Sequence, residues 1–485
     1  MKILIAYPPI ETGKGTPLLS QNRQFQFFHN PTYIFPVVPA SAATLLKNRG
    51  YEVHWKDGIA ENLSAEEFYN YFSQQNPDMI VMETKTPVIK EQWKITNKLK
   101  QLSPGTKIVL MGDHVTALPE ESLKNSRADF ILLGGDYDFS LAELADALEN
   151  NKKIPKGFVY RKGDKIIHTG NFQLQHRLDE LPFIDRELAK WKLYQKEYNI
   201  KGRPYMYIMS GRDCPWHRCK FCAWPVLFPK FRQRSVGNVI DEINLLVEKY
   251  KVKEIFDDAG TFPAQPPGKW LQDFCNGMKK SRLNEKIDYS CNMRADYLTE
   301  KNAKLMSEAG FRLLKMGLES ANQKTLDGIN KGIKVEQITQ ACRNAKKYGL
   351  TIHLTMIVGY PWETRQEAIN TLNLAKSLMQ KGYADILQST ILVPYPGTPL
   401  WKEALQKKWF RINPKDYEKY DMSKPILKTP MPEKEVEEIC NGIYKIFFTP
   451  QYIYQRIKSV RDFQDIMFIL RGVKAVFGHL QDFSR

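Results

Sequence analysis

A chain of 485 residues is longer than a typical single domain, so we expect two or three domains. Hydrophobic residues make up 42% of the chain, which is enough for packed cores and argues against global disorder. The formal net charge of +17 favours anionic partners such as nucleic acid, phosphorylated metabolites or a membrane surface, although lysines spread along a chain also form an ordinary solvated surface.

The first amino acids, MKILIAYPPI, contain a short apolar run that Pro8 and Pro9 interrupt. This run is too short for the apolar core of a signal peptide. No stretch of the chain approaches the roughly 20 apolar residues of a membrane-spanning helix. The sequence therefore predicts a cytoplasmic protein in a reducing compartment.

Residues 1–150 alternate short apolar strands with helical stretches. The expected strands are 2–7, 51–57, 78–84, 107–112 and 129–135, and the expected helices include 39–49, 65–75 and 90–102. Continuous apolar strands that alternate with helices indicate a buried parallel sheet. We expect a doubly wound, flavodoxin-like α/β domain whose ligands lie at the carboxyl ends of the strands.

The rest of the chain divides into three parts. Residues 151–203 read as a linker that contains a hairpin turning at Gly163 and Asp164. Residues 204–410 contain six strand–helix units, which suit a partial parallel barrel better than a closed eight-stranded one. Residues 411–485 become mostly helical, and the basic, amphipathic stretch 451–480 either packs on the body of the protein or lies on the inner face of a membrane.

Three of the seven cysteines, Cys214, Cys219 and Cys222, lie within nine positions, in the stretch GRDCPWHRCKFCAWP. This stretch follows the first strand of the barrel and is expected to form a loop. Three thiolates on one loop can hold a cubane iron–sulfur cluster and leave one iron open for a ligand. A zinc site needs a fourth donor, for which His217 is the nearby candidate.

The cysteine loop resembles that of the radical S-adenosylmethionine superfamily, whose usual pattern is Cys-x3-Cys-x2-Cys. This chain has one more residue in the first gap, and Phe221 is the aromatic residue that the superfamily places between the last two cysteines. The resemblance continues through segments after successive strands: FDDAGTF (256–262), YSCNMRAD (289–296), KMGLESAN (315–322) and IVGYPWET (357–364). It implies a [4Fe–4S] cluster on the three cysteines and S-adenosylmethionine on Phe221, Asp257, Asp258, Asn292, Arg294, Glu319, Ser320 and Val358.

The first 150 residues resemble the cobalamin-binding domain that precedes the barrel in a large subclass of these proteins. The resemblance rests on YPP (7–9), residues 35–58, METKTP (82–87), MGDHVTALPEE (111–121) and LLGGDYDFSLAEL (132–144). It implies a cobalamin site lined by Thr84, Thr86, Gly112, Gly134 and Gly135. The loop after the first strand has no histidine to bind cobalt, and His114 is interpreted as a surface or nucleotide-tail contact. A sheet that no longer binds corrin is the alternative.

Together these features predict a cobalamin-dependent radical enzyme that functionalises an unactivated carbon of a small molecule, by C-methylation or by cyclisation or rearrangement. The layout resembles anaerobic Mg-protoporphyrin ester cyclases and hopanoid-pathway radical proteins, which implies a lipid-like or tetrapyrrole-like substrate and a flavodoxin- or ferredoxin-type reductant. One alternative is an electron-transfer or cofactor-binding protein that does not cleave S-adenosylmethionine. Another is an RNA-modifying enzyme, but no nucleic-acid partner is expected because the end of the chain reads as helical.

Overall fold

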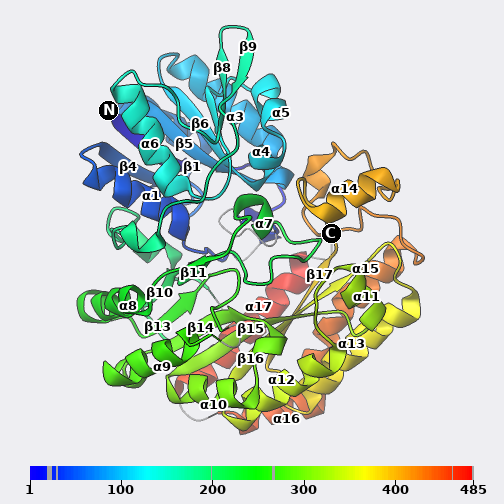
Figure 1. Cartoon of the computed structure of the whole chain (residues 1–485). Helices are drawn as coiled ribbons and strands as arrows, with labels where there is room; N and C mark the ends of the chain where they lie inside the picture. Colours follow the sequence, from blue (N-terminus) through cyan, green and yellow to red (C-terminus); the bar gives the residue numbers. More distant parts are fainter. Residues whose placement is uncertain (19–24, 29–30, 198, 265–267, 461–462, 483–485) are drawn as a thin grey trace.

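The N-terminal part of the chain forms one seven-stranded sheet (Figure 1). The computed structural model describes residues 1–18, 25–28, 31–197, 199–264, 268–460 and 463–482, of which 475–482 by their backbone alone. The strands, in their order across the sheet, are β4 (Glu52–Asp57), β1 (Lys2–Tyr7), β5 (Met79–Thr84), β6 (Lys107–Gly112), β7 (Phe130–Leu132), β8 (Phe158–Lys162) and β9 (Lys165–His168). The first five are parallel and confirm the flavodoxin-like order.

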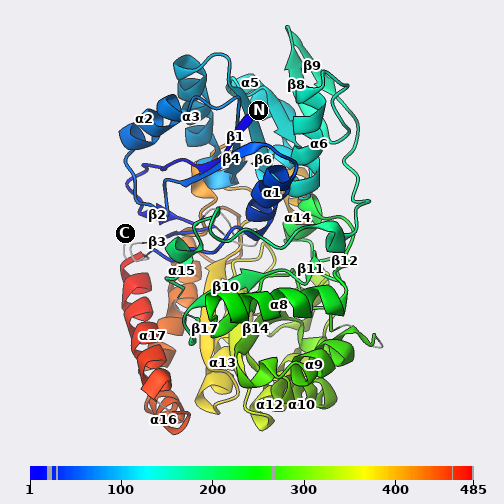
Figure 2. The ribbon, with the colours of Figure 1, turned by 90° about the vertical axis from the view of Figure 1, so that its left-hand side faces the viewer.

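Helices cover both faces of this sheet. They are needed because the strands carry apolar side chains on both faces, and both must be buried. Figure 2 shows α1 and α6 on one face and α2 and α3 on the other. The helices of this part are α1 (Val37–Asn48), α2 (Ala65–Gln75), α3 (Ile89–Leu102), α4 (Asp113–Ala117), α5 (Pro119–Asn125) and α6 (Tyr137–Glu149). Every residue of β5 is buried, which explains the apolar run 79–82 with which the strand begins.

The hairpin expected within the linker belongs to the first sheet. Strand β8 pairs antiparallel with β7, and β9 pairs with β8 across the turn at Gly163 and Asp164. The hairpin therefore covers the edge that β7 would otherwise expose. A second short pair, β2 (Thr16–Pro17) with β3 (Phe27–Phe28), lies apart from this sheet.

The second sheet contains six parallel strands that follow one another in chain order. They are β10 (Tyr205–Ile208), β13 (Glu254–Asp257), β14 (Asp288–Met293), β15 (Phe311–Glu319), β16 (Thr351–Val358) and β17 (Ile386–Ile391). The helices between them are α8 (Val236–Tyr250), α9 (Trp270–Lys280), α10 (Glu300–Glu308), α11 (Gln323–Gly328), α12 (Val335–Lys347) and α13 (Arg365–Gln380). These six units confirm the predicted partial barrel, whose edge strands are β10 and β17.

The C-terminal part is mostly helical, as predicted. It contains α14 (Pro399–Gln406), α15 (Glu433–Asn441), the 3₁₀ helix η7 (Gly442–Phe448), α16 (Pro450–Lys458) and α17 (Phe463–Asp482). Helix α17 runs along the seam between the two edge strands (Figure 2): Arg471 donates to the carbonyl of Ile200, just before β10 (3.1 Å), and Phe468 lies 5.3 Å from the Arg312 guanidinium. Among the described residues, no helix combines the length and apolar character that crossing a bilayer demands.

Candidate active site

The cysteine loop is closed at its base by a short pair of strands. Strand β11 (Gly211–Arg212) pairs antiparallel with β12 (Arg232–Gln233), so the residues between them form one excursion that includes the short helix α7 (Trp224–Leu227). The start of the loop runs close to Gly260, where a Cβ would lie 2.6 Å from the backbone of Asp213. A glycine is therefore required there for the first cysteine to take its position.

The far side of the loop docks on the turn that follows α11. The Trp216 indole donates to the carbonyl of Asn330 (2.8 Å), and its ring lies where a side chain at Gly332 would be. The amide of Lys220 donates to the carbonyl of Ile329 (2.9 Å). These contacts hold the longer first gap of the cysteine motif against the barrel.

The three cysteines line one wall of a cavity of about 170 Å³ at the carboxyl ends of the barrel strands. All three are partly buried and free of disulfides. The predicted residues that also line this cavity are Phe221, Asn292, Arg294 and Glu319. The sequence therefore predicted seven residues that the fold brings to one cavity, from the loop and from the ends of β14 and β15.

Two cations and their acidic partners face the cysteines. Arg294 makes a two-point ion pair with Asp296 (2.9 and 3.0 Å) and donates to the carbonyl of Lys331 (3.1 Å). The Lys331 ammonium lies 2.6 Å from the Glu319 carboxylate. Burial raises the pKa of the Cys219 thiol to about 11, while Lys331 and Arg294 act in the opposite direction. The positive charges of Lys331 and Arg294 would therefore favour the thiolate form of Cys219.

Four predicted cofactor residues lie outside the lining of this cavity. Asp257 accepts from the backbone of Ser210 (3.1 Å) and from the Tyr289 hydroxyl (2.9 Å), so its carboxylate fastens β13 to its neighbours. Asp258 accepts from the Asn292 amide (3.3 Å). The side chain of Ser320 is 3.3 Å from Thr371 on α13, and Val358 is fully buried in β16.

His217, the candidate fourth donor for zinc, is already engaged. Its Nδ1 atom lies 2.6 Å from the carboxylate of Asp213, which is buried. In the part of the chain that the structure describes, no three His, Cys, Asp or Glu side chains converge on one ion position. A cubane cluster does not require such convergence, because each thiolate binds a different iron.

The residues predicted to contact cobalamin lie at the carboxyl edge of the first sheet. The Thr84 hydroxyl donates to the carbonyl of Met111 (2.8 Å), and a Cβ at Gly112 would lie 2.3 Å from the carbonyl oxygen of Thr84. The other two glycines make room for protein side chains: a Cβ would lie 2.5 Å from the Phe172 ring at Gly134 and 2.3 Å from the Phe228 ring at Gly135. Phe228 follows α7, so the cysteine loop itself covers Gly135.

The interpretation of His114 as a surface residue is wrong. Its side chain is completely buried, with Nδ1 3.1 Å from the Thr86 hydroxyl and the ring 4.8 Å from that of Tyr417. Tyr417 comes from the C-terminal part of the chain, about 300 positions away, in the 3₁₀ helix η6 (Tyr417–Lys419). A neighbour that distant could not be foreseen from the local sequence.

Sequence reasoning missed a buried polar cluster at the same edge. The Lys85 ammonium lies 3.6 Å from Glu83 and 3.7 Å from Asp113, and the Tyr7 hydroxyl donates to Glu83 (2.6 Å). Burial raises the pKa of the Glu83 carboxyl. The available signal was the pair of charges in METKTP, at the end of a strand that is otherwise apolar.

Ion pairs join the base of the cysteine loop to the first sheet. Arg212 on β11 donates to Asp136 (2.6 Å) and Asp138, and Arg232 on β12 donates to Asp136 (2.6 and 2.8 Å). The two aspartates lie where α6 begins. These ion pairs therefore hold the cysteine loop of the second sheet against the carboxyl edge of the first sheet.

Comparison with known families matches both parts of the chain. Residues 208–375 match the model of the radical SAM superfamily, and residues 33–139 match that of the B12 binding domain. The chain is a radical S-adenosylmethionine enzyme with a cobalamin-binding domain. The radical match includes the whole cysteine loop, and the B12 match includes the carboxyl ends of β5, β6 and β7.

Curated relatives of this radical enzyme include methyltransferases and a cyclase. An uncharacterized methyltransferase of Pyrococcus horikoshii is 28% identical over 92% of each chain. An anaerobic magnesium-protoporphyrin IX monomethyl ester cyclase of Cereibacter sphaeroides is 26% identical over 79% of this chain and 62% of its own length.

Solved structures share the fold. OxsB, a cobalamin-dependent S-adenosylmethionine radical enzyme with aqua-cobalamin and S-adenosylmethionine bound, aligns over 99% of this chain and 70% of its own, with a TM-score of 0.69 and 15% identity. The methyltransferase TsrM from Kitasatospora setae aligns over 85% of this chain and 76% of its own, with a TM-score of 0.67 and 16% identity.

The cofactors of this radical enzyme are a [4Fe–4S] cluster, S-adenosylmethionine and cobalamin. The residues present fit all three. Three thiols with two facing cations suit an anionic cluster, and the cavity beside them holds the charged and amide groups that an amino acid moiety binds. At the edge of the first sheet, the Tyr137 hydroxyl is buried without a hydrogen-bond partner among the described residues, so a polar cofactor can satisfy it.

Proposed function

We propose that the enzyme methylates an unactivated carbon of a small molecule. When bound, the cluster with S-adenosylmethionine supplies a 5′-deoxyadenosyl radical, and cobalamin supplies a methyl group. The observation that carries the proposal is the placement of the cysteine cavity, whose loop is fastened by Arg212 and Arg232 to the edge of the cobalamin-binding sheet. The methyltransferases among the relatives support methylation.

We assign the following roles to the side chains of the cavity. Cys214, Cys219 and Cys222 hold the cluster. Arg294 and Lys331 bind the carboxylate of S-adenosylmethionine, and Glu319 keeps Lys331 charged by pairing with it at 2.6 Å. Asn292 and the aromatic ring of Phe221 complete the wall that excludes water. Asp257, Asp258, Ser320 and Val358 support this wall from behind.

At the cobalamin-binding edge, we assign direct contact with the cofactor to Thr84, Thr86 and Gly112. Gly134 and Gly135 contribute indirectly, because they allow Phe172 and Phe228 to pack there. We place the boundaries of the functional units at residues 150, 203 and 410, with the β8–β9 hairpin of the linker 151–203 added to the edge of the first sheet.

The product ratio of the anaerobically reconstituted and reduced enzyme tests the reaction. A methylation converts R–H, two S-adenosylmethionine molecules and two electrons into R–CH₃, 5′-deoxyadenosine, methionine and S-adenosylhomocysteine. The two nucleosides should therefore form in equal amounts. Formation of 5′-deoxyadenosine with no S-adenosylhomocysteine would reject methylation in favour of a cyclisation or rearrangement, the reaction type that the cyclase relative suggests.

The proposal extends to the substrate class and the reductant. The magnesium-protoporphyrin ester cyclase among the relatives supports a tetrapyrrole-like or lipid-like substrate. A one-electron donor of the flavodoxin or ferredoxin type would supply the electrons. An assay uses S-adenosylmethionine with deuterated methyl groups and omits each electron donor in turn. The deuterium that reaches the product measures the requirement for that donor directly.

Peripheral contact with an anionic membrane is part of the same proposal. Tyr454, Ile457 and Phe463 expose 62–72% of their area, and Lys458 and Lys474 in the same two helices are also exposed. Apolar side chains flanked by cations suit the surface of an anionic bilayer. Co-sedimentation with phosphatidylglycerol vesicles, and its loss in Phe463→Ser, would measure this contact.

A further inference from the structure

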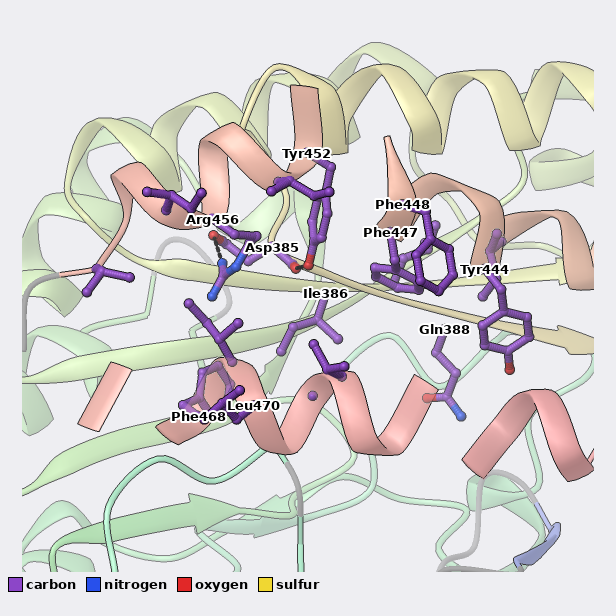
Figure 3. A pocket seen from close by; sticks show the side chains of 18 of the residues that line it. Asp385, Ile386, Gln388, Tyr444, Phe447, Phe448, Tyr452, Arg456, Phe468 and Leu470 are labelled. Atoms are coloured by element: carbon purple, nitrogen blue, oxygen red, sulfur yellow. Dashed lines mark hydrogen bonds and ion pairs between the residues drawn. The ribbon is translucent and has the colours of Figure 1, made fainter. Parts of the chain in front are cut away.

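A second cavity, of about 730 Å³, lies between β17 and the C-terminal helices (Figure 3). Residues 385–389 of β17 and its approach form one wall, η7 and α16 form the second, and α17 forms the third. Its lining residues differ from those of the cysteine cavity. This volume falls in the range of about 300–1,000 Å³ that small-molecule sites occupy.

The lining of this cavity is mostly aliphatic and aromatic. The apolar side chains come from all three walls: Ile386 and Leu387; Ile443, Phe447, Phe448, Ile453, Ile457 and Val460; Ile466, Phe468, Ile469, Leu470 and Val473. At one end, Arg456 is paired with Asp385 (2.8 Å), and the Tyr452 hydroxyl donates to the carbonyl of Asp385 (3.1 Å). The polar groups at that end are therefore already satisfied by one another.

The polar groups at the opposite end lie toward the reaction site. Figure 3 shows Gln388 and Tyr444 at this end, with the amide of Gln388 extending from β17 toward α17. Ser389 lines the apolar cavity, and Thr390, the next residue, lines the cysteine cavity. Strand β17 therefore contributes to the walls of both cavities.

We infer that this cavity binds the hydrocarbon chain of a single-chain amphiphile, with the polar end of that molecule at Gln388. A mostly apolar lining suits a hydrocarbon chain, and the side chains of Gln388 and Tyr444 suit a hydroxyl or carboxyl head. The inference stands apart from the proposed methylation, because binding requires neither a reduced cluster nor turnover.

Gly472 on α17 provides a way to fill the cavity without disturbing the fold. It lines the cavity, and a Cβ at this position would meet no atom within 4 Å. Replacing a glycine within a helix also raises the helix propensity. Gly472→Phe should therefore occupy the space of the hydrocarbon chain without lowering the unfolding temperature of the protein.

The test is a fluorescence titration of the anaerobic holoenzyme with cis-parinaric acid. We expect saturable binding of about one probe per chain, competition by farnesol, and an affinity about tenfold or more weaker in Gly472→Phe. Gly237→Phe is the matched control, because Gly237 lies exposed on α8 and its Cβ would also meet open space. Binding that Gly472→Phe leaves unchanged, or no saturable binding, would overturn the inference.

A surface variant distinguishes the cavity from membrane contact. Phe463 is 72% exposed and does not line the cavity, so Phe463→Ser should leave the probe affinity unchanged. Loss of probe binding in Phe463→Ser but not in Gly472→Phe would assign the apolar surface to a membrane and reject the cavity. Once binding is established, the rate of 5′-deoxyadenosine formation with farnesol shows the role of the bound amphiphile. A faster rate identifies its hydrocarbon chain as part of the substrate. An unchanged rate identifies the amphiphile as a lipid held apart from the reaction.

Discussion

The Arg212 guanidinium and the Asp138 carboxylate form a two-point ion pair between the cysteine loop and the first turn of α6. Arg212 lies two residues before Cys214, and both partners are almost completely buried. Asp136 beside them has a pKa below its ordinary value, because Arg212 and Arg232 outweigh the opposing effect of burial. The position of the cluster loop therefore depends on charges in the cobalamin-binding sheet.

Removing this arginine should destabilise the joint between the two sheets. Arg212→Ala leaves the buried Asp138 carboxylate without its partner, and the loss of one member of a buried pair costs about 3–5 kcal/mol. We expect a lower unfolding temperature by calorimetry. Arg282→Ala, which breaks an exposed ion pair with Glu285, should unfold at the wild-type temperature. Equal unfolding temperatures for Arg212→Ala and wild type would contradict the assignment.

Removal of one cavity cysteine should abolish the cluster. Cys219→Ala leaves two thiols, which cannot hold three irons of a cubane, so iron and sulfide should fall to background after anaerobic reconstitution. Cys275→Ala is the control, because Cys275 is buried on α9 away from the cavity. Full iron content in Cys219→Ala would exclude this cysteine as a ligand.

The cation opposite the cysteines should contribute to binding of S-adenosylmethionine. Lys331→Met removes a charged donor of the kind that contributes about 1.5–3 kcal/mol, so the dissociation constant should rise about 10- to 100-fold. Equilibrium dialysis with the reconstituted enzyme measures this change. Lys324→Met, at an exposed position on α11, should bind normally. An unchanged affinity in Lys331→Met would remove the proposed carboxylate contact.

Stability should fall with rising pH because of one buried carboxyl. Burial raises the pKa of Glu363 to about 7 from an ordinary value of 4.5. The folded protein then binds this proton more tightly than the unfolded chain, so its contribution is fully present below pH 4.5 and is lost as pH rises through 7. At about 1.4 kcal/mol per pKa unit, the loss of stability is at most about 3.5 kcal/mol.

Glu363→Gln keeps an acceptor for the Gly359 amide, which donates to Glu363 at 2.9 Å, and removes the titration. The unfolding temperature of this variant should vary less between pH 5 and pH 8 than that of wild type, and should exceed it at pH 8. Glu66→Gln, at an exposed position on α2, should retain the wild-type dependence. A parallel decline in wild type and Glu363→Gln would show that another group is responsible.

The repeating patterns of the sequence predicted both sheets, because strand and helix periodicity is a local property. They also predicted which strand ends meet in the cavity, since the carboxyl ends of parallel strands share one edge. Lys331 was missed because it reaches Glu319 only after the chain returns through α11. The packing of Phe172 against Gly134 was missed for a similar reason: a glycine in the sequence does not reveal which partner occupies the space that it leaves.

The edge strand β17 contributes to both cavities through different positions: Ile386 and Gln388 line the apolar one, while Thr390 and Ile391 line the cysteine cavity. Mutations at the first pair would alter the length or shape of an accepted chain and leave the radical chemistry intact. Paralogues that arise by gene duplication could therefore acquire new substrates through a few changes in half of one strand.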